Sequence, residues 1–123
     1  MKRHPQLIQL SREHHAALRL GRHLLAGGAA GELRAEYPAL AAHFAEEERD
    51  LLPLLQRHGH LALAARLRDE HAQLHALFAA ASNGAGEAEA GQALIAHVRF
   101  EERTLFPAIE TLFAQGAPQH PPR

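Results

Sequence analysis

The chain has 123 residues, which suffice for one domain with a substantial apolar core and leave little room for a second. Its formal net charge is −1 and its Lys and Arg residues are spread along the chain, so the sequence lacks the basic patch of a nucleic-acid-binding protein. Cysteine is absent, which excludes disulfides, thiolate metal sites and cysteine nucleophiles and leaves histidine and carboxylate chemistry.

Long apolar segments are also missing from the sequence. No apolar run reaches the roughly 18 residues of a membrane span, and the segment MKRHPQLIQLSREHH lacks the apolar centre of a secretory signal. We therefore expect a cytoplasmic protein that binds neither membranes nor nucleic acid.

Apolar residues recur at steps of three and four in the first half of the chain, which is typical of amphipathic helices. The first pattern predicts a helix over residues 6–26, which a pair of glycines ends. The second pattern lies between Gly31 and Gly59, and we expect it to be disturbed at Pro38 and Pro53.

Two further helical patterns follow, over residues 60–82 and 87–114, and the segment SNGAG separates them. Period-two alternation and hairpin turn pairs are missing, so strands are not expected. The sequence predicts an all-α, up-down-up-down four-helix bundle over residues 1–116, followed by a disordered tail over residues 117–123.

Two segments of the chain repeat the same pattern of ionisable residues. HFAEEERDLLP and HVRFEERTLFP align at a constant offset of 54 residues. His43 therefore matches His97, and Glu47 matches Glu101. Each copy ends in a proline, which lacks an amide hydrogen, so we expect each helix to kink there.

In each predicted helix the apolar residues form a stripe along one face. Near the middle of each helix, ionisable residues interrupt this stripe. Residues four apart share one face of a helix, and antiparallel packing brings the four midpoints to one level. In the first helix His14 is chosen over His15 because it continues the stripe of Leu10. The seven candidate metal ligands are His14, His43, Glu47, His71, His75, His97 and Glu101.

A single histidine on such a stripe is more often a hydrogen-bonded core side chain than a ligand. Seven ionisable side chains buried together would each cost several kcal/mol unless paired or bound to metal. No Lys or Arg lies on the stripes at these levels, so the set favours a metal centre. The residues Tyr37, Glu46, Glu48, His4, His23, His58, His60 and His120 lie off the stripes and receive no role.

The number of donor atoms indicates how many ions the centre holds. Five imidazoles and two carboxylates offer nine donor atoms, too many for one tetrahedral or octahedral ion. If both carboxylates and a solvent oxygen bridge an octahedral pair, one coordination position stays open. Nitrogen and oxygen donors suit iron, manganese or zinc, and the spacing does not choose among them.

Together the seven candidates resemble the five-histidine, two-carboxylate ligand set of the hemerythrin-like (HHE cation-binding) domains, and the resemblance spans residues 7–112. It implies a non-haem di-iron centre, two Fe ions with an oxo or hydroxo bridge, in a four-helix bundle. It further implies that Glu47 and Glu101 bridge the irons, and that the open position faces a small molecule such as O2.

One feature departs from the oxygen-carrying hemerythrins, which have HxxxxD in the last helix. This chain has HxxxE at His97 and Glu101, and Glu102 is acidic at the five-residue spacing. We expect O2 binding for storage, delivery or sensing. The alternatives are a di-iron enzyme acting on nitric oxide or peroxide and an iron sensor or store; the sequence leaves the redox partner and the oligomeric state open.

Other histidine sites fit less well. A ferritin-like oxidase needs a Glu-x-x-His pair on each of two helices, and no glutamate here has that spacing to a histidine. A zinc hydrolase of the HExxH type needs a glutamate between its two histidines, which EHAQLH lacks. A haem bundle does not explain the two glutamates.

Overall fold

A computed structural model describes residues 4–116 of the chain. The predicted disordered tail over residues 117–123 lies outside the described residues. Within the described part every element is helical and no strand occurs, so the predicted all-α fold is confirmed. Among these residues, no helix is long and apolar enough to cross a lipid bilayer.

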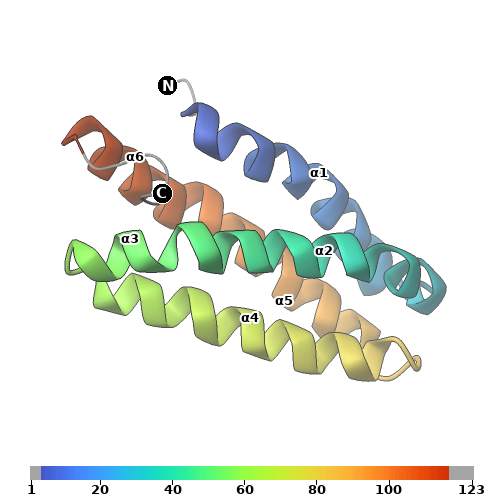
Figure 1. The fold of residues 1–123 in the computed structure, drawn as a ribbon. Helices are drawn as coiled ribbons and strands as arrows, with labels where there is room; N and C mark the ends of the chain where they lie inside the picture. The colour runs from blue at the N-terminus through green and yellow to red at the C-terminus, as the bar shows by residue number, and fades with distance from the viewer. Residues whose placement is uncertain (1–3, 117–123) are drawn as a thin grey trace.

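The described helices form the predicted up-down-up-down bundle (Figure 1). The first long helix is α1 (Pro5–Ala26), and α2 (Ala30–Asp50) with the short α3 (Leu52–Arg57) returns beside it. After α4 (Leu61–Ala81), the last long helix consists of α5 (Glu87–Phe100), the π-helical turn η1 (Glu101–Leu105) and α6 (Phe106–Ala114). The first and last described residues therefore lie at the same end of the bundle.

Prolines mark two of the three helix irregularities that the sequence predicts. The second long helix is interrupted at Leu51, two residues before Pro53, and the last one widens into η1 just before Pro107. Pro38 does not interrupt the helix, because α2 continues through that residue. Pro38 is exposed, so water can satisfy the carbonyl group that its missing amide leaves free.

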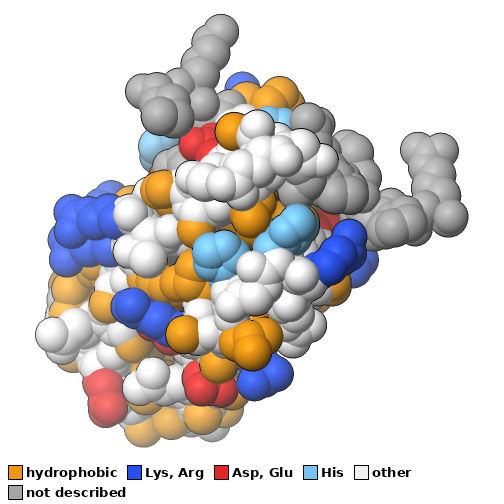
Figure 2. Space-filling model, turned by 90° about the vertical axis from the view of Figure 1, so that its left-hand side faces the viewer, with side chains coloured by type: hydrophobic (Ala, Val, Ile, Leu, Met, Phe, Trp, Pro, Cys, Tyr) orange, Lys and Arg blue, Asp and Glu red, His pale blue; other side chains and the backbone are white. Residues whose placement is uncertain are grey.

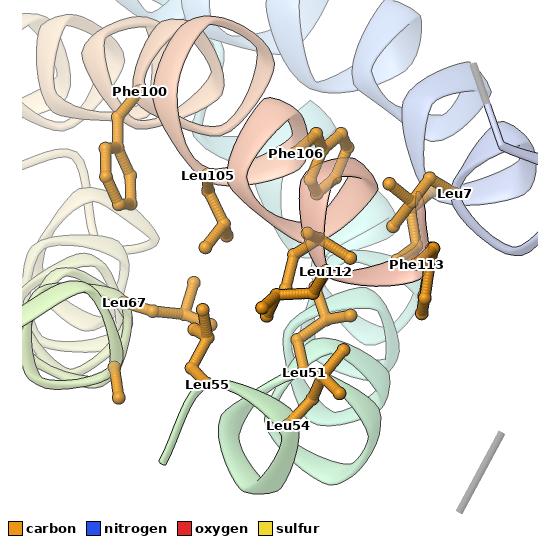
Figure 3. Close-up of a cluster of buried hydrophobic side chains, with 13 residues drawn as sticks. Leu7, Leu51, Leu54, Leu55, Leu67, Phe100, Leu105, Phe106, Leu112 and Phe113 are labelled. Atoms are coloured by element: carbon orange, nitrogen blue, oxygen red, sulfur yellow. The ribbon is translucent and has the colours of Figure 1, made fainter. Parts of the chain in front are cut away.

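Two separate apolar clusters fill the bundle, one on each side of its middle. The terminal cluster lies toward the end where the chain begins and is drawn in Figure 3. It comprises Leu7, Leu10, Leu51, Leu54, Leu55, Ala64, Leu67, Phe100, Leu105, Phe106, Ile109, Leu112 and Phe113. The distal cluster comprises Ala17, Leu20, Leu24, Ala29, Leu33, Leu40, Phe44, Leu74, Phe78, Ala81, Ala90, Leu94 and Val98. The level between the clusters is the one where all four stripes turn polar.

The outer surface carries charges of both signs. Figure 2 shows the end of the bundle at which α1 begins and α6 ends, where acidic, basic and histidine side chains alternate with apolar ones. On the described part of this face, neither acidic nor basic side chains form a continuous patch.

Helices α1 and α5 approach each other closely at two glycines. A Cβ atom on Gly91 would lie 2.5 Å from the carbonyl oxygen of Gly21 and 2.9 Å from the Cβ of Leu24. A Cβ atom on Gly21 would lie 2.8 Å from a side-chain carbon of Ile95. The two helices can therefore pack at this distance only where side chains are missing.

We expect Gly91→Ala to destabilise the protein by about 1–3 kcal/mol, because the added methyl group meets backbone that cannot move independently. Gly31→Ala is the matched control, since the nearest atom to its new Cβ is a flexible arginine nitrogen 3.6 Å away. This control should stabilise α2 by about 0.5–1 kcal/mol. Urea unfolding followed by circular dichroism measures both, and equal midpoints for the two variants would contradict the close approach.

Candidate metal centre

Six ionisable side chains meet between the two apolar clusters, and each is at most 5% exposed. Their ligand atoms form two groups, in each of which the atoms lie within 4.8 Å of one another. The first group is His14, His43, Glu47 and Glu101, and the second is Glu47, His71, His97 and Glu101. The structure thus brings six of the seven predicted ligands together, with both glutamates common to the two groups.

Glu101 directs one oxygen at each group. Its Oε1 lies 2.7 Å from Nε2 of His14 and 3.7 Å from Nε2 of His43. Its Oε2 lies 3.1 Å from Nε2 of His97 and 3.9 Å from Nε2 of His71. One carboxylate therefore stands between two pairs of imidazoles.

Glu47 repeats this arrangement from the opposite helix. Its Oε2 lies 3.1 Å from Nε2 of His43, and its Oε1 lies 3.0 Å from Nε2 of His71. Each glutamate thus offers one oxygen to each group, which is the arrangement that a bridging carboxylate between two metal ions requires.

Burial opposes ionisation of both carboxyl groups, but their neighbours shift the two pKa values in opposite directions. The four neighbouring imidazoles outweigh burial at Glu101 and hold its pKa well below the usual range. At Glu47, burial and then the negative charge of Glu101 raise the pKa. Without metal, the cluster is held together by protons shared between these carboxylates and the imidazoles.

The same contacts favour the protonated imidazoles. Burial opposes protonation of His43, but the neighbouring carboxylates of Glu101 and Glu47 outweigh it and raise its pKa to about 11. His71 and His97 respond in the same way, with pKa values raised to about 9. A metal ion that binds here must replace these protons, so binding is coupled to proton release.

Each buried imidazole turns its other nitrogen, Nδ1, outward to a glutamate of a neighbouring helix. The pairs are His43 with Glu13 at 2.7 Å, His71 with Glu48 at 2.7 Å, His97 with Glu70 at 2.6 Å and His14 with Glu102 at 2.6 Å. These four carboxylates form a closed circuit around the bundle, because each helix supplies a glutamate to the histidine of the next. We call Glu13, Glu48, Glu70 and Glu102 the outer glutamate ring. Such partners fix the orientation of a metal-binding imidazole and the nitrogen that faces inward.

Sequence reasoning missed the outer glutamate ring. We expected no role for Glu48, and that expectation is wrong because Glu48 contacts His71. A signal does exist in the sequence: each ring glutamate directly precedes or follows a residue of the buried cluster, as in EH at 13–14 and EE at 47–48.

The donor set fits a metal ion. Within the described residues, Oε2 of Glu47, Nε2 of His97 and Oε2 of Glu101 are buried and have no hydrogen-bond partner. Unpartnered buried polar atoms are rare in folded proteins and often mark the place of an ion or water. All three atoms belong to the inner faces of the two groups, where a shared pair of ions would contact them.

The structure does not bring His75, the seventh predicted ligand, into either group. Its Nδ1 forms a short hydrogen bond with the hydroxyl group of Tyr37. The ring of Phe44 lies beside it, 5.6 Å from the His75 ring, and stacks on His71 at 4.3 Å. Phe44 therefore occupies the space on the side of His71 that faces His75.

The other histidines of the described residues belong to neither ligand group. His15 is exposed, which agrees with the choice of His14 as the inward residue. His4 accepts a hydrogen bond from the amide of Gln6 at the start of α1, and His23 contacts Glu32 at 2.7 Å on the surface. His120 lies outside the described residues.

Comparison with known proteins agrees with this geometry. No curated protein and no solved structure matches the chain. A family model does match, the hemerythrin HHE cation-binding domain, and the match covers residues 3–109. Since this covers most of the sequence, the four-helix bundle with its buried histidines and glutamates belongs to the hemerythrin HHE cation-binding family.

Proposed function

We propose that the protein holds two iron ions side by side between the apolar clusters and binds O2 there, for storage, delivery or sensing. The observation that carries the proposal is that Glu47 and Glu101 each direct one carboxylate oxygen at the first group of ligands and the other oxygen at the second group. One ion would take His14 and His43, and the other would take His71 and His97. Mixed nitrogen and oxygen donors without sulfur suit iron, which supplies the redox chemistry that O2 binding needs.

The protein's own residues would prepare the site in three ways. The outer glutamate ring keeps every Nδ1 protonated, so that Nε2 faces the ions as a neutral ligand. Phe44 and Phe106 stack on His71 and His14 and hold these rings in place. The apolar clusters exclude water from both sides, which slows the loss of a bound small molecule.

A second function, an enzyme acting on nitric oxide or peroxide, is favoured by the position of His75. Without this side chain, four imidazole nitrogens and four carboxylate oxygens remain as donors. An octahedral pair with one bridging solvent oxygen would then keep an open position on each ion, where the sequence count left one in total. Adjacent open positions suit a substrate that touches both ions.

The proposed ligand assignment predicts the metal content. Protein produced in iron-sufficient medium should contain close to two irons per chain by elemental analysis. His97→Ala removes a buried donor and should lower this content, whereas His75→Ala should leave it unchanged because Tyr37 holds that side chain outside both groups. A content near one in the folded wild-type protein would contradict the shared carboxylates.

The reaction with O2 separates the two functions. Anaerobically reduced, iron-loaded protein mixed with O2 in a stopped-flow spectrometer should develop visible charge-transfer absorption. In a carrier this absorption reverses under argon, whereas in an enzyme it decays quickly and the protein turns over added nitric oxide or hydrogen peroxide. Absence of any spectral change with two irons bound would reject O2 binding in favour of iron storage or sensing.

The outer glutamate ring should control metal affinity. Glu48→Gln weakens the hydrogen bond that orients His71, so we expect iron affinity to fall about 10- to 100-fold. Glu46→Gln is the matched control on the same helix, because Glu46 belongs neither to the ring nor to either ligand group. Competition with a coloured chelator measures both affinities. If the two variants bind iron equally well, the ring does not position the ligands.

A further inference from the structure

A cavity of about 150 Å³ opens between α1 and α2 beside the metal centre. Five of its eight lining side chains are alanine or leucine, and the other three are His43, Glu13 and Glu36. Ala39 is exposed and Ala16 half-buried, so both lie toward the mouth. The cavity is therefore an apolar recess with two carboxylates among its walls.

The inner end of this cavity reaches the metal centre at one imidazole. His43 lines the cavity, and its Nε2 lies 3.1 Å from the shared carboxylate of Glu47. Glu13 also lines the cavity and holds Nδ1 of the same ring. A molecule in the cavity would thus lie beside His43, which is itself a member of the first group of candidate ligands.

The surroundings of the second group of ligands differ. Phe44 stacks on His71 at 4.3 Å and meets the ring of His97 edge-on at 5.6 Å. These contacts cover the pair of imidazoles with an aromatic ring on the α2 side. The two groups share the carboxylates of Glu47 and Glu101. The first group borders the cavity at His43, whereas Phe44 covers the imidazoles of the second group.

A second surface cavity, between α1 and α5, has a different chemistry. Four of its seven lining side chains are charged, namely Arg22, Arg99, Arg103 and Glu102, and the other three are Leu18, Ile95 and Val98. Charged walls suit water and anions, whereas O2 and similar gases partition into apolar space. Of these two cavities, the one between α1 and α2 is suited to a small apolar molecule.

We propose that the cavity between α1 and α2 is the docking site of O2, which waits there before it reaches the ion held by His14 and His43. Five of the eight side chains that line it are alanine or leucine, and apolar cavity walls bind small apolar molecules such as xenon. This inference rests on the proposed O2 function and adds the side from which the gas arrives.

Xenon tests the docking site without any metal. Xenon NMR of the metal-free protein, or a xenon-pressurised crystal, should detect the gas beside His43. Ala16→Phe fills the cavity and should abolish the signal. Ala42→Phe is the matched control, because Ala42 is an exposed residue of α2 that does not line the cavity. Ala39→Phe, at an exposed rim position, serves as a second filling variant if Ala16→Phe does not fold. Absence of xenon from the wild-type cavity would overturn the proposal.

The O2 kinetics test the route. In reduced, iron-loaded protein, Ala16→Phe or Ala39→Phe should slow the O2-dependent spectral change about tenfold or more, with iron content unchanged. Ala42→Phe should react at the wild-type rate. Xenon binding combined with equal O2 rates in all variants would show that O2 arrives by another path and would reject the route. If wild-type protein does not react with O2, the proposed O2-binding function is rejected. The xenon experiment alone then shows whether the cavity binds an apolar gas.

Discussion

The structure depends on two buried carboxylates shared by four imidazoles. Glu101 and Glu47 are fully buried, and a carboxylate in an apolar interior is unstable unless charged or hydrogen-bonded partners surround it. The partners come from all four long helices, so each helix must place one imidazole at the same level. Sliding one helix by a turn, about 5.4 Å, would remove its imidazole from the carboxylates. The ionisable cluster therefore fixes the alignment of helices that the apolar clusters alone would specify less tightly.

The outer glutamate ring connects this buried charge with solvent. Its four side chains are between 24% and 40% exposed, whereas the imidazoles that they contact are at most 5% exposed. A charge at the centre of the bundle is thus two hydrogen bonds away from water. This arrangement lets the buried ionisable residues carry several protons or metal charges, although the terminal and distal apolar clusters lie on either side of them. It also means that the buried imidazoles and carboxylates of this hemerythrin-family protein are surrounded by a layer of glutamates that come from all four long helices.

The helix pattern and most of the cluster could be predicted from the sequence because both follow from periodicity. Residues four apart share a helix face, and this rule identifies His43 with Glu47 and His97 with Glu101. The rule does not fix which way a side chain turns. His71 and His75 also lie four apart, yet Phe44 and Tyr37 direct only the first toward the cluster.

Contacts between helices account for the other features that the sequence did not reveal. Glu48 occupies a position on α2 that looks solvated when that helix is considered alone, and only the approach of α4 gives it a partner. The π-helical turn at Glu101–Leu105 is likewise invisible to periodicity, although Pro107 marks its neighbourhood. In η1 the amide of Phe106 bonds to the carbonyl group of Glu101, five residues back, and this wider turn lies where Glu101 faces inward and Glu102 faces His14.

The glycine contact between α1 and α5 has a consequence for synthesis on the ribosome. Gly91 is added seventy positions after Gly21. At 5–20 residues per second, roughly 4–14 seconds therefore pass between the synthesis of this part of α1 and that of its contact on α5. During this interval the apolar stripe of α1 can contact only α2 and α4, or a chaperone. The bundle can close only when the last helix has emerged, so a truncated chain that ends before α5 would leave this stripe uncovered and prone to aggregate.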